Sequence, residues 1–372
     1  MSCHFYLFFF SFFLLASYSS VVVAAVDECG EESTHGCYDR SKALWLKFVA
    51  IGTILGASMI GVCSPFFFQS LPIFHPDGNI FIIVKAFASG VILATGYMHV
   101  LPDSFNDLNS PCLPDHPWRD FPFTTFVAMI SAIFTLMVDS FMMSVYNRKC
   151  CAHHEVDQDP EVVKRTVELE NEEGARPPLI FHGHGHGQGH NHEVMHSQEM
   201  RDALEQEQKI KARGRKRVIA QVLEMGIVVH SVVIGLALGS SQNPCTIKPL
   251  VVALCFHQLF EGMGLGGCIL QAEYRRKMKV IMAFFFSITT PFGIALGIGL
   301  SKIYRANSPT ALIVVGLLNA ASAGLLNYMA LVDLLAADFL GPRLQASVGL
   351  QGWAYIAVLL GAGLMSVMAK WA

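Results

Sequence analysis

The chain has 372 residues, of which 53% are hydrophobic and 15% charged, and its formal net charge is −3. A soluble globular domain usually has about a quarter of its residues charged, so this composition excludes an ordinary soluble protein. Several separate windows of about 20 apolar residues recur, each long enough to cross a hydrocarbon core of about 30 Å as a helix. The composition therefore predicts a polytopic membrane protein.

The N-terminal residues resemble a secretory signal. Residues 5–25 are apolar and end in small residues, Val23, Ala24 and Ala25, of the kind that signal peptidase cuts. We interpret residues 1–25 as a cleaved signal peptide and residues 26–42 as an extracellular segment. A retained first span is the alternative, because the first four residues lack a positive charge.

Four cysteines then fall outside the cytosol. Cys29 and Cys37 follow the predicted cleavage site, and their pairing with each other is one expectation. Cys112 and Cys245 fall in or near predicted external loops. An oxidising compartment allows all four to form disulfides.

Hydropathy predicts an all-α fold with eight transmembrane helices after removal of the signal peptide. Residues 43–147 hold the first three helices, residues 148–216 form a cytosolic loop, and residues 217–372 hold the other five. The expected spans are residues 43–67, 79–101, 123–146, 217–240, 247–270, 280–303, 310–332 and 350–370.

Lys and Arg predict the orientation, since they gather in the cytosolic loops of membrane proteins. Two regions are strongly basic: the flanks of residues 148–216, and the connection between the fifth and sixth spans. These side chains are Arg148, Lys149, Lys209, Lys211, Arg213, Arg215, Lys216, Arg217, Arg275, Arg276, Lys277 and Lys279. Both regions should be cytosolic, and an even number of spans then places both termini outside. In the second span we expect the ammonium of Lys85 to reach the cytosolic interface and to have no functional role.

The central loop, residues 148–216, is polar and is expected to be largely disordered, with marginal helices at residues 162–173 and 198–210. It contains a tract that concentrates imidazoles on a glycine-rich backbone: His182, His184, His186, His190 and His192. Such tracts bind Zn(II) without a fixed fold, so we expect a regulatory role on the cytosolic side. A linker with no role is the alternative.

Ionisable side chains lie at membrane depth in the fourth and fifth spans. His230 is in the fourth span, and His257 and Glu261, four residues apart, share one face of the fifth. Each such group costs about 2.5 to 3.5 kcal/mol on insertion scales and therefore needs a partner. Two imidazoles and a carboxylate form a nitrogen and oxygen site that suits Zn(II) or Fe(II). Ser231 and Gln258, one residue beyond each His, are candidates for weaker oxygen ligands. Hydrogen bonding between helices is the alternative.

At these residues the sequence resembles a known family. His230 to Gly235 (HSVVIG) and His257 to Gly262 (HQLFEG) are similar to the paired signatures of the ZIP family, zinc- and iron-regulated transporter-like proteins, and most similar to its plant branch. Further segments agree with that branch and extend the resemblance from Leu44 to the C-terminus: residues 96–103 (GYMHVLPD), 289–293 (TTPFG) and 328–333 (YMALVD).

The resemblance implies a transporter that moves a divalent metal ion, zinc with iron(II) or manganese as further candidates, toward the cytosol. It implies a central site of His230, His257 and Glu261, with Ser231 and Gln258 at a neighbouring position. Family members with a two-metal centre have acidic residues where Ile234 and Thr290 stand here, which puts a second metal in doubt.

The resemblance also implies that His99 and Asp103, four residues apart in the second span, capture the ion at the outer entry. We expect the plasma membrane as the location, the bilayer and the metal ion as partners, and a homodimer as the candidate assembly. No prosthetic group and no nucleic-acid partner are expected.

Two other classes of protein are alternatives. An intramembrane metalloenzyme can hold a catalytic zinc with the same residue types, but none of the predicted spans has an HExxH motif, and the chain has no GxSxG motif. The one HExxH match, residues 192–196 (HEVMH), lies in the polar central loop. A metal exporter of the cation-diffusion type also has a cytosolic His-rich loop. Eight spans and the lack of an HxxxD pair in the fifth span argue against it.

Overall fold

A computed structural model describes residues 39–68, 78–157, 190–301 and 308–370. The predicted signal peptide and Cys29 and Cys37 lie outside these residues. The chain forms two compact units, one of residues 1–137 with 219–372 and one of residues 138–218. The candidate metal ligands in the spans all lie in the first unit.

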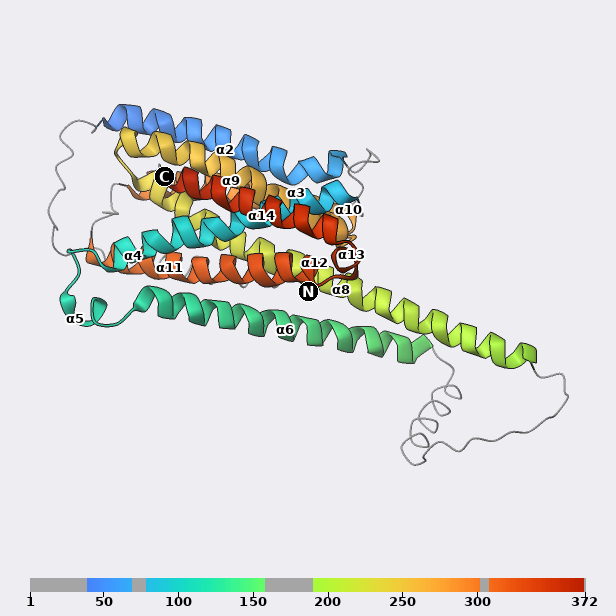
Figure 1. Ribbon diagram of the computed structural model, residues 1–372. Coiled ribbons are helices and arrows are strands. Elements are labelled where there is room, and N and C mark those ends of the chain that lie inside the picture. The colour runs from blue at the N-terminus through green and yellow to red at the C-terminus, as the bar shows by residue number, and fades with distance from the viewer. Residues whose placement is uncertain (1–38, 69–77, 158–189, 302–307, 371–372) are drawn as a thin grey trace. The chain divides into compact units, whose positions relative to one another are not determined.

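The first unit is a bundle of helices (Figure 1). Helix α6 (Phe123–Asp157) begins in it, and helix α8 (His190–Ser240) ends in it. Two π-helical segments, η2 and η4, interrupt the second and seventh spans. The remaining elements are α2 (Arg40–Phe68), α3 (Asn79–Ala94), η2 (Thr95–Val100), α4 (Leu101–Leu108), α5 (Asp115–Trp118), α9 (Pro244–Gln271), α10 (Arg276–Leu300), α11 (Pro309–Tyr328), η4 (Met329–Ala336), α12 (Ala337–Phe339), α13 (Pro342–Gln345) and α14 (Val348–Ala369).

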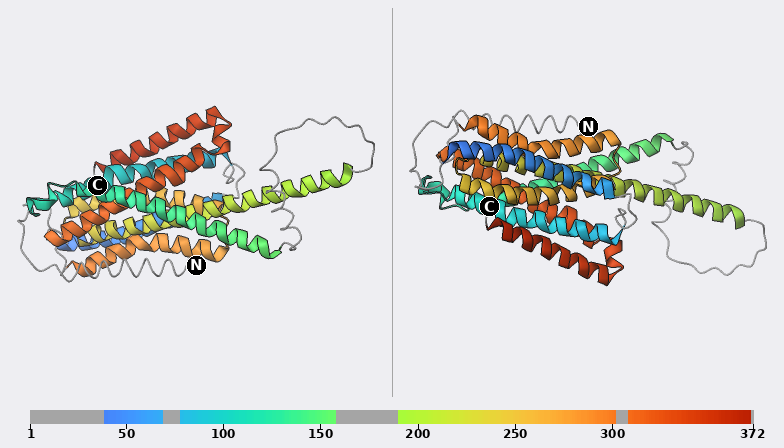
Figure 2. Two further views of the ribbon diagram at one scale, coloured as in Figure 1. Left: turned by 90° about the horizontal axis from the view of Figure 1, so that it is seen from below. Right: turned by 90° about the horizontal axis from the view of Figure 1, so that it is seen from above.

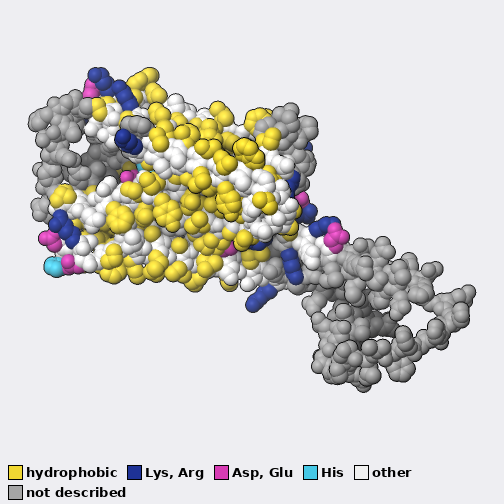
Figure 3. All heavy atoms as spheres, in the orientation of Figure 1, with side chains coloured by type: hydrophobic (Ala, Val, Ile, Leu, Met, Phe, Trp, Pro, Cys, Tyr) yellow, Lys and Arg dark blue, Asp and Glu magenta, His cyan; other side chains and the backbone are white. Residues whose placement is uncertain are grey.

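Eight helices within the described residues are long and apolar enough to cross a membrane, as the sequence predicts. The described secondary structure is helical, so the predicted all-α class is confirmed. Figure 3 shows the corresponding surface: hydrophobic side chains cover the sides of the bundle on this face, and charged side chains gather toward its ends. Large side chains such as Phe284 on α10 and Leu359 on α14 are more than half exposed, as expected where lipid is the solvent.

The second and seventh spans are longer than predicted. The second continues through Pro102 to Leu108, and the seventh runs to Phe339. In each, a π-helical segment stands where the prediction ended the helix. The wider π turn of η2 precedes Pro102 and relieves the clash that a proline ring makes with the preceding turn of an α-helix.

The second unit, residues 138–218, is described by itself. In it α6 continues to Asp157 and α8 starts at His190, so the prediction of a largely disordered loop at 148–216 is wrong for 148–157 and 190–216. The helix expected at 198–210 is present, and residues 162–173 lie outside the described part. A run rich in Glu, Gln, Lys and Arg has high helix propensity, and an existing helix extends without a new nucleus. The ion pair between Lys209 and Glu205, 2.7 Å, supports this exposed segment.

Glycines bring pairs of helices in the first unit into backbone contact. A Cβ atom added to Gly61 on α2 would lie 2.3 Å from a carbonyl oxygen of α9, and one on Gly239 of α8 would lie 2.3 Å from a carbonyl oxygen of α10. Helices α3 and α14 approach as closely: a Cβ atom added to Gly90 on α3, or to Gly361 on α14, would lie 2.2 Å from a carbonyl oxygen of the other helix. Both views in Figure 2 agree with the pairing of α3 and α14. Because lipid removes the hydrophobic drive between helices, such close packing holds the bundle together.

Two glycines on α14 allow a matched test of this packing. Alanine at Gly361 has no room, whereas nothing lies within 4 Å of a Cβ at Gly363. Gly361→Ala should lower the free energy of unfolding by about 1 to 3 kcal/mol through overpacking. Gly363→Ala should leave it unchanged or raise it by up to about 1 kcal/mol. Thermal unfolding of both variants in detergent measures the difference, and equal midpoints would contradict the account.

Candidate metal centre

A short turn between α8 and α9 sets the depth of the candidate ligands. Helix α8 ends at Ser240 and α9 starts at Pro244, with the side chain of Asn243 accepting a hydrogen bond from the amide of Cys245 at 2.9 Å. Proline suits the first helical position, where its missing N–H costs nothing. The two helices therefore run antiparallel from this turn. His230, ten residues before it, and His257, thirteen residues after Pro244, reach similar depths.

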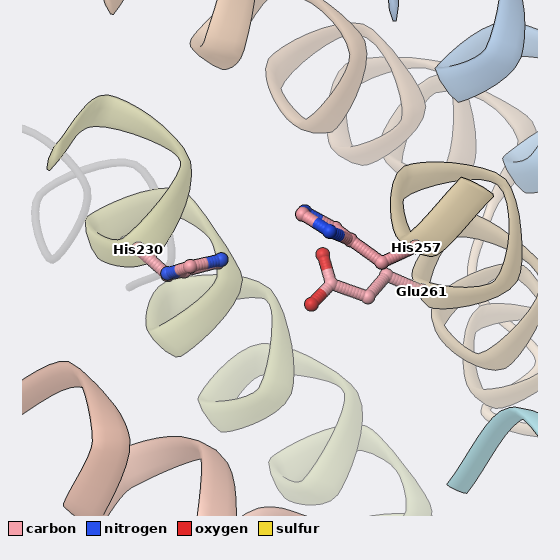
Figure 4. Close-up of side chains that lie close together, drawn as sticks. All are labelled: His230, His257 and Glu261. Atoms are coloured by element: carbon pink, nitrogen blue, oxygen red, sulfur yellow. The ribbon is translucent and has the colours of Figure 1, made fainter. Parts of the chain in front are cut away.

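His230, His257 and Glu261 converge between α8 and α9 (Figure 4). One ligand atom from each lies within 4.8 Å of the other two. The imidazole centroids of His230 and His257 are 5.7 Å apart. All three side chains are at most 1% exposed. The residues that the sequence selected for a central site therefore do come together.

The nitrogen and oxygen atoms of these side chains lack partners. Within the described residues, neither ring nitrogen of His230 or His257 and neither carboxyl oxygen of Glu261 has a hydrogen bond. Leaving a buried polar group unpaired costs roughly 1 to 3 kcal/mol in proteins. A zinc ion, which binds imidazole nitrogen and carboxylate oxygen at about 2.0 to 2.2 Å, could take one ligand atom from each of these side chains. The donor set therefore fits a borderline-soft divalent cation.

Beside the central site, Ser231 and Gln258 offer polar atoms, whereas Ile234 offers only hydrocarbon. Ser231 and Gln258 are buried, and their side-chain polar atoms have no hydrogen bond within the described residues. Ile234 instead packs in an apolar cluster with Ile54 and Ile294. Thr290 is buried and adds one neutral hydroxyl. Ile234 offers no ligand at this position, and the number of metals that bind here stays a prediction.

The proposed outer residues lie next to the central ones. His99 stands in the π-helical segment η2 and is 5% exposed, and its imidazole centroid is 6.3 Å from that of His257. Its Nδ1 atom lies 3.9 Å from a carboxyl oxygen of Asp103, whose side chain is 49% exposed. A chain of ligand groups thus connects a half-exposed carboxylate to the buried centre. The sequence alone did not reveal that His99 approaches His257.

Asp107 extends this row and was missed by the sequence analysis. It lies four residues beyond Asp103 in α4, and its carboxylate accepts a hydrogen bond from Asn319 of α11 at 3.3 Å. The spacing of His99, Asp103 and Asp107 at four residues is the signal that would have found it.

Two other predictions end differently. Lys85 does not reach the interface, because it is 7% exposed and its ammonium pairs with Asp338 at 2.9 Å. That expectation was wrong, since a partner distant in the sequence holds the ammonium inside. His182, His184 and His186 lie outside the described residues, and His190 and His192 stand at the start of α8. Metal binding by this tract stays a prediction.

Eight membrane-spanning helices around a buried cluster of metal-ligand side chains define a class, the polytopic metal transporters. The family model described as ZIP zinc transporter matches residues 44–369. The chain therefore belongs to the ZIP family, as the HSVVIG and HQLFEG segments indicate.

Similar proteins from plants agree with this assignment. Fe(2+) transport protein 1 of Oryza sativa subsp. japonica is 61% identical over 336 residues, which cover 90% of this chain and 86% of the relative. Probable zinc transporter 10 of Arabidopsis thaliana is 54% identical over 345 residues, covering 93% and 91%. Zinc transporter 7 of Arabidopsis thaliana is 53% identical over 350 residues, covering 94% and 92%. These relatives are transporters, not enzymes.

Metal binding at the centre should appear as metal-dependent stability. Zinc at about 100 times its dissociation constant should stabilise the wild-type protein by about 2.7 kcal/mol. His257→Leu should abolish this shift and, in metal-free buffer, unfold no earlier than the wild type, because it removes two unpaired buried nitrogens.

Thermal unfolding with and without zinc measures both effects. His116→Ala, at a histidine whose side chain is 86% exposed, is the matched control and should keep the shift. All proteins in the comparison lack residues 182–192, which removes the imidazoles of the tract. An undiminished zinc shift in His257→Leu would contradict the site.

Proposed function

We propose that the protein carries a divalent transition-metal ion, Zn(II) or Fe(II) with Mn(II) as a further candidate, toward the cytosol through His230, His257 and Glu261. The observation that carries this proposal is the convergence of three buried side chains, each with one ligand atom within 4.8 Å of the others, whose nitrogen and oxygen atoms have no hydrogen bond within the described residues. The names of the relatives, which mention Fe(2+) and zinc, support the choice of metals.

Three strong ligands suit transport better than permanent retention. A transporter site has to select an ion and then release it, reached from one side at a time. Structural zinc sites usually have four protein ligands, whereas this group has three. Beside them lie the neutral side chains of Ser231 and Gln258, and the imidazole of His99 is 6.3 Å from that of His257. Ser231 and Gln258 supply these neutral donors and tune the preference among metals.

The membrane potential supplies a driving force for entry. Each charge gains about 2.3 kcal/mol per 100 mV, so a divalent ion gains about 4.6 kcal/mol on moving to the negative side. Inward movement of the ion thus needs no nucleotide.

Charge and cysteine chemistry support an orientation with both termini outside. The basic residues at the start of α10, from Arg275 to Lys279, favour a cytosolic position for that end of the helix. Cys112, between α4 and α5, and Cys245, at the start of α9, are each disulfide-bonded, as cysteines in an oxidising compartment are. The ion would then enter past Asp103 and His99. The plasma membrane and a homodimer belong to this proposal as its expected location and assembly.

Replacing any of the three central ligands should remove transport without removing the protein. Ala at position 230, 257 or 261 deletes one of three strong ligands, and it makes membrane insertion easier because each native group is costly there. Initial zinc uptake should fall at least about tenfold, equivalent to about 1.4 kcal/mol, at normal surface abundance. Ser231→Ala and Gln258→Ala should keep uptake and shift the relative rates for zinc, iron and manganese.

Radioactive uptake and surface labelling in the same cells measure these effects. His116→Ala, far from the centre in α5, controls for loss of an imidazole. Net efflux from cells that express the wild type would reverse the direction, and wild-type uptake by the His230 or Glu261 variant would refute the site.

The His-rich tract should regulate transport without performing it. Replacing residues 182–192 with an epitope tag should leave more than about a tenth of initial uptake, because the central ligands are intact. The tag should be detected only after permeabilisation, because the basic flanks place this segment in the cytosol. Labelling of the tag on intact cells would contradict the orientation, and near-complete loss of uptake at normal surface abundance would contradict the regulatory role.

A further inference from the structure

Helices α3 and α9 pack against each other. The side chains between them form a row that runs along the proposed transport path. At the outer end, His99 of η2 approaches His257 of α9. In the middle, a Cβ at Gly264 would contact Ile92 at 3.4 Å and Ala88 at 3.6 Å. Ile92 is fully buried, so hydrocarbon fills this level between the helices.

The ion pair of Lys85 with Asp338 lies at the other end of the same interface. Lys85 lies fourteen residues before His99, which is two heptads and therefore nearly the same helix face. Cys268 lies seven residues after Glu261, about 10 Å further along the same face of α9. Cys268 also lies about one helical turn before Gln271, whose side chain is 3.4 Å from the ammonium of Lys85. From the centre toward the basic end of the bundle, this face of α9 thus leads past hydrocarbon to a buried ammonium.

The ammonium of Lys85 connects three elements. It donates to Asp338 of α12 at 2.9 Å and to Gln271, the last residue of α9, at 3.4 Å. α9 is also the helix that carries His257 and Glu261. A contact at the end of α9 is therefore mechanically coupled to the metal ligands.

We propose that Lys85, paired with Asp338 and Gln271, is the inner gate of the transport path. This proposal rests on the proposed function. A positive ammonium on the way out of the centre repels a divalent cation, and its contact with Gln271 holds the end of α9 against α3. Release of the ion requires this contact to break and Lys85 to withdraw, which exposes Cys268 to the cytosol.

The competing explanation is that the contact of Lys85 with Asp338 and Gln271 is purely structural and never breaks. A buried ion pair is a poor source of stability, because desolvation offsets most of its attraction. The two explanations differ in what happens during turnover. If Lys85 is a gate, its contact breaks in every transport cycle, whereas a purely structural contact stays intact.

The native thiol of Cys268 reports on opening. It is free and 3% exposed. We would treat inside-out vesicles, which present the cytosolic end, with N-ethylmaleimide and quantify alkylation of each cysteine by peptide mass spectrometry. Cys63 and Cys255 are also free and serve as internal controls for general loosening of the fold.

In zinc-free wild-type vesicles Cys268 should be protected, and a zinc gradient that drives turnover should raise its alkylation rate several-fold. Lys85→Met should raise the zinc-free rate at least about tenfold, a population shift toward the open state. Removing a nearby ammonium makes a thiol less reactive, so a faster rate reports access. Lys47→Met, at a lysine of α2 that is 2% exposed, is the matched control and should leave Cys268 protected.

Release of zinc from the lumen of the same inside-out vesicles, which corresponds to movement toward the cytosol, separates the two proposals. If the wild type does not transport zinc, the proposed function fails. If it transports zinc while Cys268 stays protected during turnover, the gate is refuted and the function stands. If the alkylation rates of Cys63, Cys255 and Cys268 all rise together in Lys85→Met, the fold has loosened as a whole, and the role of Lys85 is structural.

Discussion

Desolvation of two imidazoles and a carboxylate at one point of the bundle is the constraint on which the rest of the structure depends. His230, His257 and Glu261 lose water on burial and gain no hydrogen bond from the described residues. A protein can carry this cost when a cation supplies the missing interactions. The antiparallel turn between α8 and α9 places the ligands at one depth. The surrounding helices keep them away from lipid and water.

Close helix packing makes this arrangement possible in a bilayer. Glycines let the α2 and α9 backbones, and those of α8 and α10, touch without intervening side chains. The helices that bear the ligands are therefore fixed by shape and not by hydrophobic burial. The two π-helical segments, η2 and η4, are the exceptions to regular packing, and one of them presents His99 to the centre. Irregular turns of this kind are common at functional sites.

Much of this organisation follows from the sequence, and the rest does not for physical reasons. Apolar length predicts the eight spans, and the four-residue spacing of His257 and Glu261 predicts a shared face. Hydropathy did not predict that the second span passes Pro102, because a π turn has no compositional signal. It also did not predict the pair of Lys85 and Asp338, which lie 253 residues apart. Contacts of that kind depend on tertiary packing, which a local pattern of residues in the sequence does not reveal.

X-ray absorption at the zinc edge tests the central claim most directly. The sample is the protein without residues 182–192, loaded with one equivalent of zinc. The account predicts a first shell of nitrogen and oxygen at about 2.0 to 2.2 Å with the multiple scattering of two imidazoles, and loss of that signature in His257→Leu. A sulfur shell at about 2.3 Å, or an imidazole signature that persists in the variant, would contradict it.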